Sequence, residues 1–330
     1  MSAQPHAIGA AMPAAVIDAN RRSERDARAD KLFHGLLATA GLLVLITLVG
    51  VALSMLWGGR EALSHFGLGF FFSTDWDPVN NKFGALVPVY GTLVSALIAM
   101  LIAVPVSFGI ALFLTEIAPN WMRGPVGAAI ELLAGIPSII YGMWGLFVFV
   151  PLLGEHVAPW LNDHVGSLPL IGPLFQGPPL GIGMLTAGFV LAIMIIPFIS
   201  SVMREVFLTV PTRLKESAYA LGSTKWEVVW DIVLPYTRTA VVGGVFLGFG
   251  RALGETMAVA YLVGNSVQFT ASLLEPSTTI AALIANDFNE STGLHRSSLL
   301  LLGFVLFIVT FIVLAAARLM LLRLSRKEGN

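Results

Sequence analysis

Six long apolar segments limit what this chain of 330 residues can fold into. They lie at about residues 33–57, 86–115, 126–151, 182–204, 239–264 and 297–321. Each is near or above the ~20 residues that a helix needs to cross the hydrocarbon core of a bilayer. Because lipid cannot satisfy exposed backbone polar groups, every spanning segment must be helical. The sequence therefore predicts an all-α membrane protein with six transmembrane helices.

The composition supports this class. Of all residues, 56% are apolar and only 12% are charged, which is about half the charged fraction of an average soluble domain. There is no cysteine, which excludes a disulfide framework and any cysteine-ligated metal site. The first apolar segment is too long for the core of a signal peptide, and no small-residue cleavage site follows it. We therefore expect it to be a retained span.

Lysine and arginine are unevenly distributed around the predicted spans. Fifteen lie in the N-terminal segment, the loop at Arg123, the insert near residues 205–238 and the C-terminal tail, and three lie in the opposite loops. Because cytoplasmic loops carry the excess of positive charge, both termini and the insert are predicted to face the cytoplasm. Residues 1–31 are alanine-rich and then charged, and we expect them to lack fixed structure.

The three loops on the opposite side are long, at about residues 58–85, 152–181 and 265–296. The last one contains TTIAALIANDF, whose apolar residues at helical spacing predict a short helix lying at the surface. These loops either form a surface for a soluble partner or simply connect spans, and the residues alone leave both open.

The polar insert between the fourth and fifth spans is predicted to contain two short helices. Pro211 and Thr212 are typical of the first turn of a helix, and Gly222 is typical of a helix end. Thr224 with Glu227 three residues later is a capping-box pattern that predicts the start of a second helix.

Pro235 predicts where that second helix ends. A short helix with its own caps, held at a membrane face, is suited to lie in a groove on a soluble partner.

Predicted spans contain the charged residues Arg251, Glu255 and Glu131. Charges in lipid are costly, so such groups usually pair with one another or face a water-filled path. Arg251 and Glu255 are four residues apart and are expected on one face of a helix. They either neutralise each other or form an anion site, where Arg251 attracts an oxyanion and Glu255 accepts a hydrogen bond from its proton. Glu131 is expected to reach the membrane interface.

The insert resembles the coupling loop of bacterial ABC importer permeases, whose pattern is E-A-A-x3-G-x9-I-x-L-P. The matching residues are Glu216, Ala218, Gly222, Ile232, Leu234 and Pro235. Ser217 stands where the pattern has its first alanine. The resemblance implies that these residues dock on the ATPase subunits. The alternative is a polar loop with no docking role.

Three segments, LKESAYALGSTKWEVVWDIVLP, GRALGETMAVA and ELLAGIPSIIYGMWGLF, resemble a narrower family. They are similar to the C-type permease subunit of the bacterial phosphate-specific ABC importer, a binding-protein-dependent transport inner-membrane component, over about residues 86–320. The resemblance implies the type I ABC importer permease fold and import of inorganic phosphate across the inner membrane by alternating access. It also places Arg251 and Glu255 in the substrate pathway.

The same resemblance implies a set of partners and a division of the chain. The partners are a second permease subunit in a heterodimer, an ATP-binding cassette ATPase dimer and a periplasmic phosphate-binding protein, besides phosphate and membrane lipid. The parts are a cytoplasmic disordered segment at 1–31, the first transmembrane helix and periplasmic loop at 32–85, the permease transmembrane domain at 86–322 with its coupling loop at 205–238, and a cytoplasmic tail at 323–330.

The sequence contains no G-x-x-x-x-G-K-[ST] loop, so the chain is not expected to cradle ATP phosphates. We expect a permease rather than an enzyme, with no catalytic residue, metal site or cofactor of its own, and with ATP and Mg²⁺ used by the partner ATPase. Basic clusters lie beside spans, which gives no indication of nucleic-acid binding. Two alternatives remain, an ABC permease for another oxyanion such as molybdate or sulfate, and a secondary transporter that works without an ATPase.

Overall fold

The computed structural model describes the backbone of residues 14–328 and the side chains of residues 29–323. Within the described residues, six helices are long and apolar enough to cross a membrane. They are Ala29–Gly58, Leu86–Ile117, Ser138–His164, Met184–Leu208, Lys225–Leu253 and Gly293–Arg323. The predicted all-α membrane class and the number of spans are therefore confirmed.

The chain forms two compact units, of which the first ends at Ser54 and the second begins at Met55. Helix α1, Ala14–Gly58, contains the first span. We expected residues 1–31 to lack fixed structure, and this is wrong for residues 14–31, which are helical; residues 1–13 lie outside the described part. The reason is local, because residues 14–31 contain alanine and arginine, which favour helix, and neither glycine nor proline.

The second unit contains the remaining elements. Its helices before the insert are α2 (Arg60–Phe66), α3 (Leu86–Leu112), α4 (Asn120–Ala134), α5 (Ser138–Trp144), α6 (Val150–Leu152), α7 (Ala158–His164) and α8 (Met184–Leu208). Those from the insert onward are α9 (Thr212–Ala220), α10 (Lys225–Val228), α11 (Leu234–Leu253), α12 (Met257–Leu262), α13 (Ile280–Asp287) and α14 (Gly293–Glu328). Strands β1 (Trp76–Asp77) and β2 (Lys82–Phe83) form an antiparallel hairpin.

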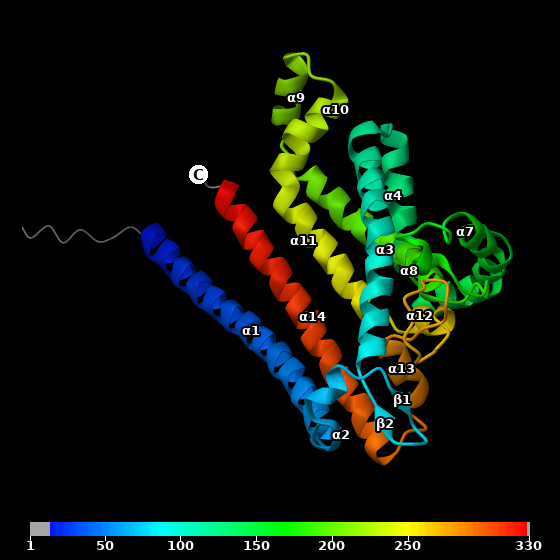
Figure 1. Cartoon of the computed structure of the whole chain (residues 1–330). Coiled ribbons are helices and arrows are strands. Elements are labelled where there is room, and N and C mark those ends of the chain that lie inside the picture. The colour runs from blue at the N-terminus through cyan, green and yellow to red at the C-terminus, as the bar shows by residue number, and fades with distance from the viewer. Residues whose placement is uncertain (1–13, 329–330) are drawn as a thin grey trace, which may run out of the picture. The chain divides into compact units, whose positions relative to one another are not determined.

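Helices α3 and α8 form the centre of the second unit (Figure 1). They pack along each other, and α11 packs against both. Small residues allow this approach: a Cβ added at Gly188 of α8 would lie 2.7 Å from the Cβ of Ile98 in α3. The main core is built from fully buried side chains of α8, such as Leu191, Ile195 and Ile199.

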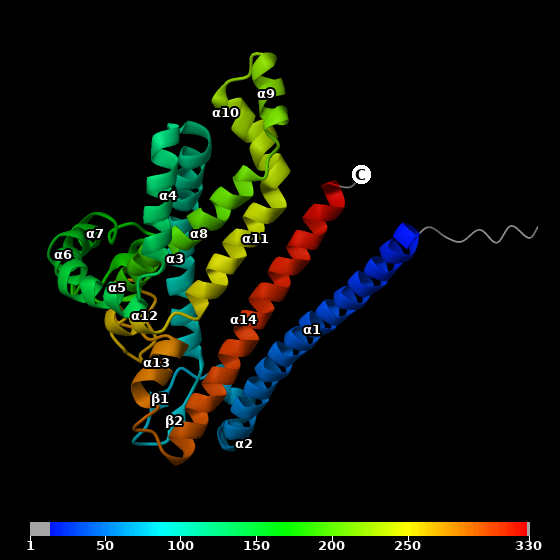
Figure 2. The same cartoon turned by 180° about the vertical axis from the view of Figure 1, so that it is seen from behind.

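The two ends of the second unit carry different structures (Figures 1 and 2). Helices α9 and α10 lie at one end, and the hairpin β1–β2 lies with α13 at the other. At the hairpin end, Phe70, Trp76 and Phe83 form a second apolar cluster with α13 and α14. The insert and the long loop of residues 58–85 are therefore on opposite sides of the unit, as the charge distribution predicted.

Two predicted spans have wrong boundaries. The third was expected at residues 126–151, but α4 is a separate helix and the span begins at Ser138. Pro137 separates them, since the residue before a proline is disfavoured in the helical region. The fifth was expected at 239–264, but the helix that contains it begins in the insert at Lys225 and already ends at Leu253.

The short helix in the last long loop exists as α13, but its predicted position at the surface is wrong. Ile280, Ala282 and Leu283 are buried, and α13 packs against α3, α12 and α14. The side chain of Thr279 accepts a hydrogen bond from the N–H of Ala282 at 3.2 Å and caps the helix. Apolar spacing predicts a helix with one apolar face but does not specify whether lipid or protein covers that face.

Gly91 of α3 offers a test of this packing. A Cβ there would collide with the backbone carbonyl oxygen of Thr278, in the segment that leads into α13. We expect Gly91→Ala to destabilise the protein by at least ~1 kcal/mol, because backbone cannot move aside as a flexible side chain does. Thermal unfolding in detergent measures the effect. Gly109→Ala in the same helix is the matched control, since nothing lies within 4 Å of its added Cβ, and equal stability of the two variants would contradict the expectation.

Candidate functional site

The insert forms helix α9 as predicted, with Pro211 at its N-cap. Gly222 follows its last turn with a φ of +91°, in the left-handed region that glycine adopts without steric cost. The N–H of Ser223 donates to the carbonyl of Ala218 at 3.1 Å, and the same carbonyl also accepts from the N–H of Leu221, so these two hydrogen bonds close the last turn of α9. The predicted helix end at Gly222 is thus confirmed.

The second insert helix begins at the predicted capping box. The side-chain oxygen of Thr224 accepts from the N–H of Glu227 at 3.3 Å, and the Glu227 carboxylate accepts from the N–H of Thr224 at 2.7 Å. The prediction that Pro235 ends this helix is wrong. Helix α10 continues through a π-helical turn, Val229–Val233, into α11, whose first turn contains Pro235. Proline is tolerated in the first turn of a helix. The π-helical turn before Pro235 also changes the pattern of backbone hydrogen bonds at this position.

Large apolar side chains are exposed on the insert. Leu221, in the turn, is 88% exposed, and Trp226 is 65% exposed. The rings of Trp226 and Trp230 lie edge to face with centroids 5.4 Å apart. Exposed apolar and aromatic groups gathered on one short segment are typical of a protein contact surface.

The six residues of the coupling-loop pattern have different surroundings. Glu216 and Gly222 are exposed, Ala218 and Ile232 are half-buried against the main core, and Leu234 and Pro235 lie in the first turn of α11. The first pair is open to a partner, whereas the second pair holds the insert against the helices beneath it.

The two charged residues of the fifth span are not on one helix, so the prediction that they share a helical face is wrong. Helix α11 ends two residues after Arg251, and Glu255 lies in the break before α12. Gly254 stands at the break, where its low helix propensity favours an interruption. The Glu255 carboxylate accepts from the N–H of Ala258 in α12 at 3.4 Å.

No ion pair joins Arg251 to Glu255 in the part of the chain that the structure describes. Arg251 is exposed on this chain, and its guanidinium carbon lies 5.5 Å from the centre of the Phe198 ring. Glu255 is half-buried. Mutual neutralisation therefore does not account for these charges in this conformation.

Two ion pairs near the insert were not anticipated from the sequence. Arg204 of α8 lies 3.4 Å from Glu131. Glu131 lies on α4, a separate helix, and not in the third span. Lys215 of α9 lies 2.5 Å from Glu116, at the end of the second span. The last two residues are 99 positions apart, and opposite charge near one membrane boundary was the only signal for their contact.

Burial, and secondarily the nearby Glu116 carboxylate, raises the pKa of Tyr219 above its usual value. Tyr219 lies one turn from Lys215 on α9.

The opposite end of the second unit has a groove of about 520 Å³. Its lining combines the hairpin loop and the segment after α12, and includes Asp75, Asp77, Lys82 and Gln268. Among the described residues, no group of three or more metal-ligating side chains occurs.

Comparison with known proteins assigns the family. Residues 107–326, about two thirds of the chain, match the family described as "Binding-protein-dependent transport system inner membrane component". The chain is 75% identical over 309 residues to the phosphate transport system permease protein PstC of Xylella fastidiosa (strain 9a5c), an overlap of 94% of this chain and 95% of the relative. It is 56% identical over 289 residues to the protein of that name from Pasteurella multocida, an overlap of 88% and 90%.

A solved structure agrees in fold. A bacterial alginate ABC transporter, in complex with an alginate pentasaccharide-bound periplasmic protein, has a chain that superimposes with a TM-score of 0.57, over 90% of this chain and 96% of that one. At 18% identity this likeness concerns the fold alone. The family match, the relatives and the six candidate spans agree, and the chain belongs to the binding-protein-dependent transport system inner membrane components.

Proposed function

We propose that this chain is the permease subunit of an ATP-driven importer that carries inorganic phosphate across the cell inner membrane by alternating access. The observation that carries the proposal is the 75% identity, over nearly the whole chain, to a protein named as a phosphate transport system permease. The capped insert with its exposed apolar surface supports it, because an importer without a nucleotide-binding loop needs a docking surface for an ATPase.

The proposed complex has four kinds of subunit. A second permease subunit forms a heterodimer with this chain, and an ATPase dimer binds at α9 and α10 and uses ATP and Mg²⁺. A periplasmic phosphate-binding protein delivers the ligand at the opposite end, where the groove beside the hairpin lies. The excess of lysine and arginine on the insert side supports cytoplasmic termini and a cytoplasmic insert.

In this proposal Arg251 and Glu255 line the substrate pathway. The guanidinium has planar donors that match an oxyanion and is exposed on this chain. Phosphate near neutral pH still carries a proton, which it can donate to Glu255, whereas sulfate carries none. The Glu255 carboxylate then favours phosphate over sulfate. With sulfate bound, this carboxylate would receive no hydrogen bond and would face a second negative charge.

Uptake into proteoliposomes tests the function directly. The complex is reconstituted with its ATPase and binding protein, and ATP-dependent uptake of labelled phosphate is measured against excess sulfate or molybdate. We expect uptake that depends on ATP and resists both competitors. Uptake of molybdate or sulfate in preference to phosphate would assign a different oxyanion, and uptake that persists without nucleotide and follows an ion gradient would indicate a secondary transporter.

The proposed role of Glu255 makes a second prediction. In Glu255→Gln the amide can still accept a hydrogen bond but no longer repels a fully ionised oxyanion. We expect phosphate uptake to fall about tenfold and competition by sulfate to become measurable, because a hydrogen bond to a charged acceptor contributes roughly 1.5–3 kcal/mol. Glu131→Gln is the control, since Glu131 lies on α4, outside this break. Unchanged phosphate uptake and unchanged resistance to sulfate would contradict the role.

A further inference from the structure

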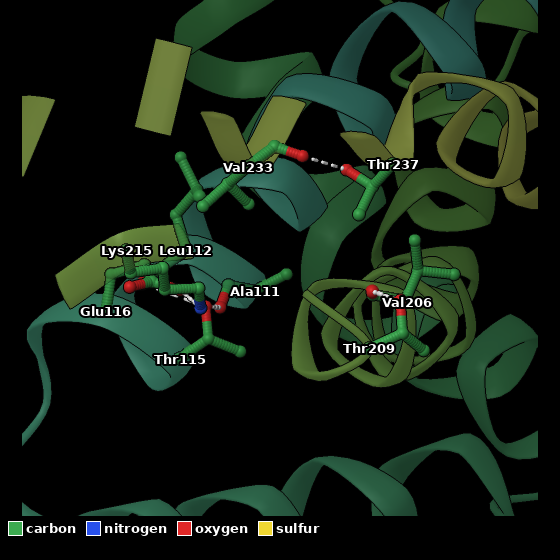
Figure 3. A network of polar contacts seen from close by, with 9 residues as sticks. All are labelled: Ala111, Leu112, Thr115, Glu116, Val206, Thr209, Lys215, Val233 and Thr237. Carbon is green, nitrogen blue, oxygen red and sulfur yellow. Dashed lines mark hydrogen bonds and ion pairs between the residues drawn. The ribbon is translucent and has the colours of Figure 1, made fainter. Parts of the chain in front are cut away.

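A nearly buried ion pair joins the insert to the second span. The Nζ atom of Lys215 lies 2.5 Å from the Oε1 atom of Glu116, and the two side chains are 16% and 8% exposed (Figure 3). The two ion pairs of Arg204 differ, because their carboxylates are 60% and 69% exposed. Solvent therefore weakens those pairs far more than it weakens the pair of Lys215 and Glu116.

Local structure holds Glu116 in place. The second span ends in a π-helical turn, Phe113–Ile117, which contains Glu116. The hydroxyl of Thr115 donates back to the carbonyl of Ala111 at 3.0 Å (Figure 3). After the turn, the carbonyl of Ala118 accepts from the Nε of Arg123 at 2.8 Å. A π-helical turn re-aims side chains relative to a regular helix, and such turns occur frequently at functional sites.

The pair changes how α9 is attached to the membrane helices. Along the chain, α9 is joined only to α8 before it and, through α10, to α11 after it. The pair of Lys215 and Glu116 adds an attachment to the π-helical turn that follows α3 at the end of the second span. Helix α3 packs along α8 and also contacts α11. The ion pair therefore joins α9 to a second span that is itself packed against the two helices to which the chain connects α9.

We propose that Lys215 and Glu116 are positioning residues that transmit movement of α9 to the second span during transport. This rests on the proposed function, in which α9 docks on the ATPase. When the ATPase moves α9, α3 moves with α8 and α11 and does not slide past them, because separating the pair would leave two nearly buried charges without partners. The pair acts on the substrate only through the helices and touches no ligand itself.

The test measures phosphate transported per ATP hydrolysed in the reconstituted complex, with Lys215→Met, Glu116→Gln and the swapped variant Glu116→Lys/Lys215→Glu. We expect each single variant to retain its ATPase on purification but to lose roughly tenfold in transport per ATP, which is in the usual range of coupling between two sites. The swapped variant restores the opposite charges and is expected to recover most of the loss. A purely stabilising pair would lower the amount of complex and leave the ratio unchanged.

A reversible crosslink allows one variant to be compared with itself, linked and unlinked, so differences in folding between variants do not affect the result. The chain has no cysteine, so Glu116→Cys/Lys215→Cys introduces the only two thiols in it. A short bifunctional thiol reagent that reductant cleaves then links the two positions. We expect the linked complex to transport nearly as much phosphate per ATP as the unmodified complex. Reductant is expected to lower this amount per ATP roughly tenfold. An unchanged ratio on reduction would overturn the proposal, as would single variants at the unmodified ratio.

Glu131→Gln is the matched control, because it removes a carboxylate from an ion pair near the same end of the unit but on α4, and Arg204 keeps Glu205 at 3.3 Å. We expect it to keep the unmodified ratio. An inactive unmodified complex would refute the proposed function before any variant is compared, whereas an active one with fully coupled variants would refute only the role of this pair.

Discussion

Arg251→Gln is expected to lower ATP-dependent phosphate uptake about a hundredfold or more, with normal amounts of the complex. The guanidinium is exposed on this chain, lies in a membrane-spanning helix and has no carboxylate partner among the described ion pairs. Its removal deletes the positive charge and two parallel donors, which at roughly 1.5–3 kcal/mol per charged hydrogen bond corresponds to a loss of this size. Uptake by proteoliposomes with matched protein content measures it.

Two further substitutions sharpen this test. Arg251→Lys keeps the charge but loses the planar fork, so an intermediate uptake is expected if geometry contributes as well as charge. Arg318→Gln removes another exposed arginine, in the last span, and is expected to leave uptake within about twofold, as for most exposed positions. Uptake by Arg251→Gln equal to that of Arg318→Gln would show that Arg251 is not in the substrate pathway.

Gly222→Val is expected to lower uptake about thirtyfold while the protein still inserts into the membrane in normal amounts. The residue has a φ of +91°, and an added Cβ meets nothing within 4 Å, so the cost is backbone strain and not a clash. For a β-branched residue this strain is about 2 kcal/mol or more. We expect the turn to relieve the strain by moving the backbone of residue 222 out of the left-handed region. That opens the end of α9 and displaces the exposed Leu221 beside it.

Gly222→Asn separates strain from the mere addition of a side chain, because asparagine tolerates the left-handed region. We expect it to keep most of the uptake. Co-purification of the ATPase with each variant reports whether the docking surface is intact. A fully active Gly222→Val variant would show that the turn after α9 is not part of the docking surface, and equal losses in both variants would show that strain is not the cause.

The insert shows what local sequence signals specify. The start of α9, its end at Gly222 and the capping box of Thr224 and Glu227 are all found where they were predicted. Each of these features depends on residues within one or two turns of one another. Pro235 shows the limit, because a proline that would end an isolated helix is accommodated by a π-helical turn where two helices join.

The pathway residues show a different limit. Spacing alone placed Arg251 and Glu255 on one helical face, but Gly254 and the hydrogen bond from Ala258 to Glu255 interrupt the helix between them. A single glycine is tolerated in many membrane helices, so its presence does not predict a break. Whether the helix continues is decided by the packing of α12 against α5 and α13, which no short segment contains.

By itself, the sequence determined the membrane class, the number of spans, the caps of the insert and the family, because apolar length, capping and a spaced motif are read within one segment. Only the tertiary structure decided that α13 is buried, that α11 breaks before Glu255, and that Lys215 meets Glu116. These outcomes depend on which surfaces the helices present to each other after folding. Charges separated by 99 residues come together only when the intervening helices have packed.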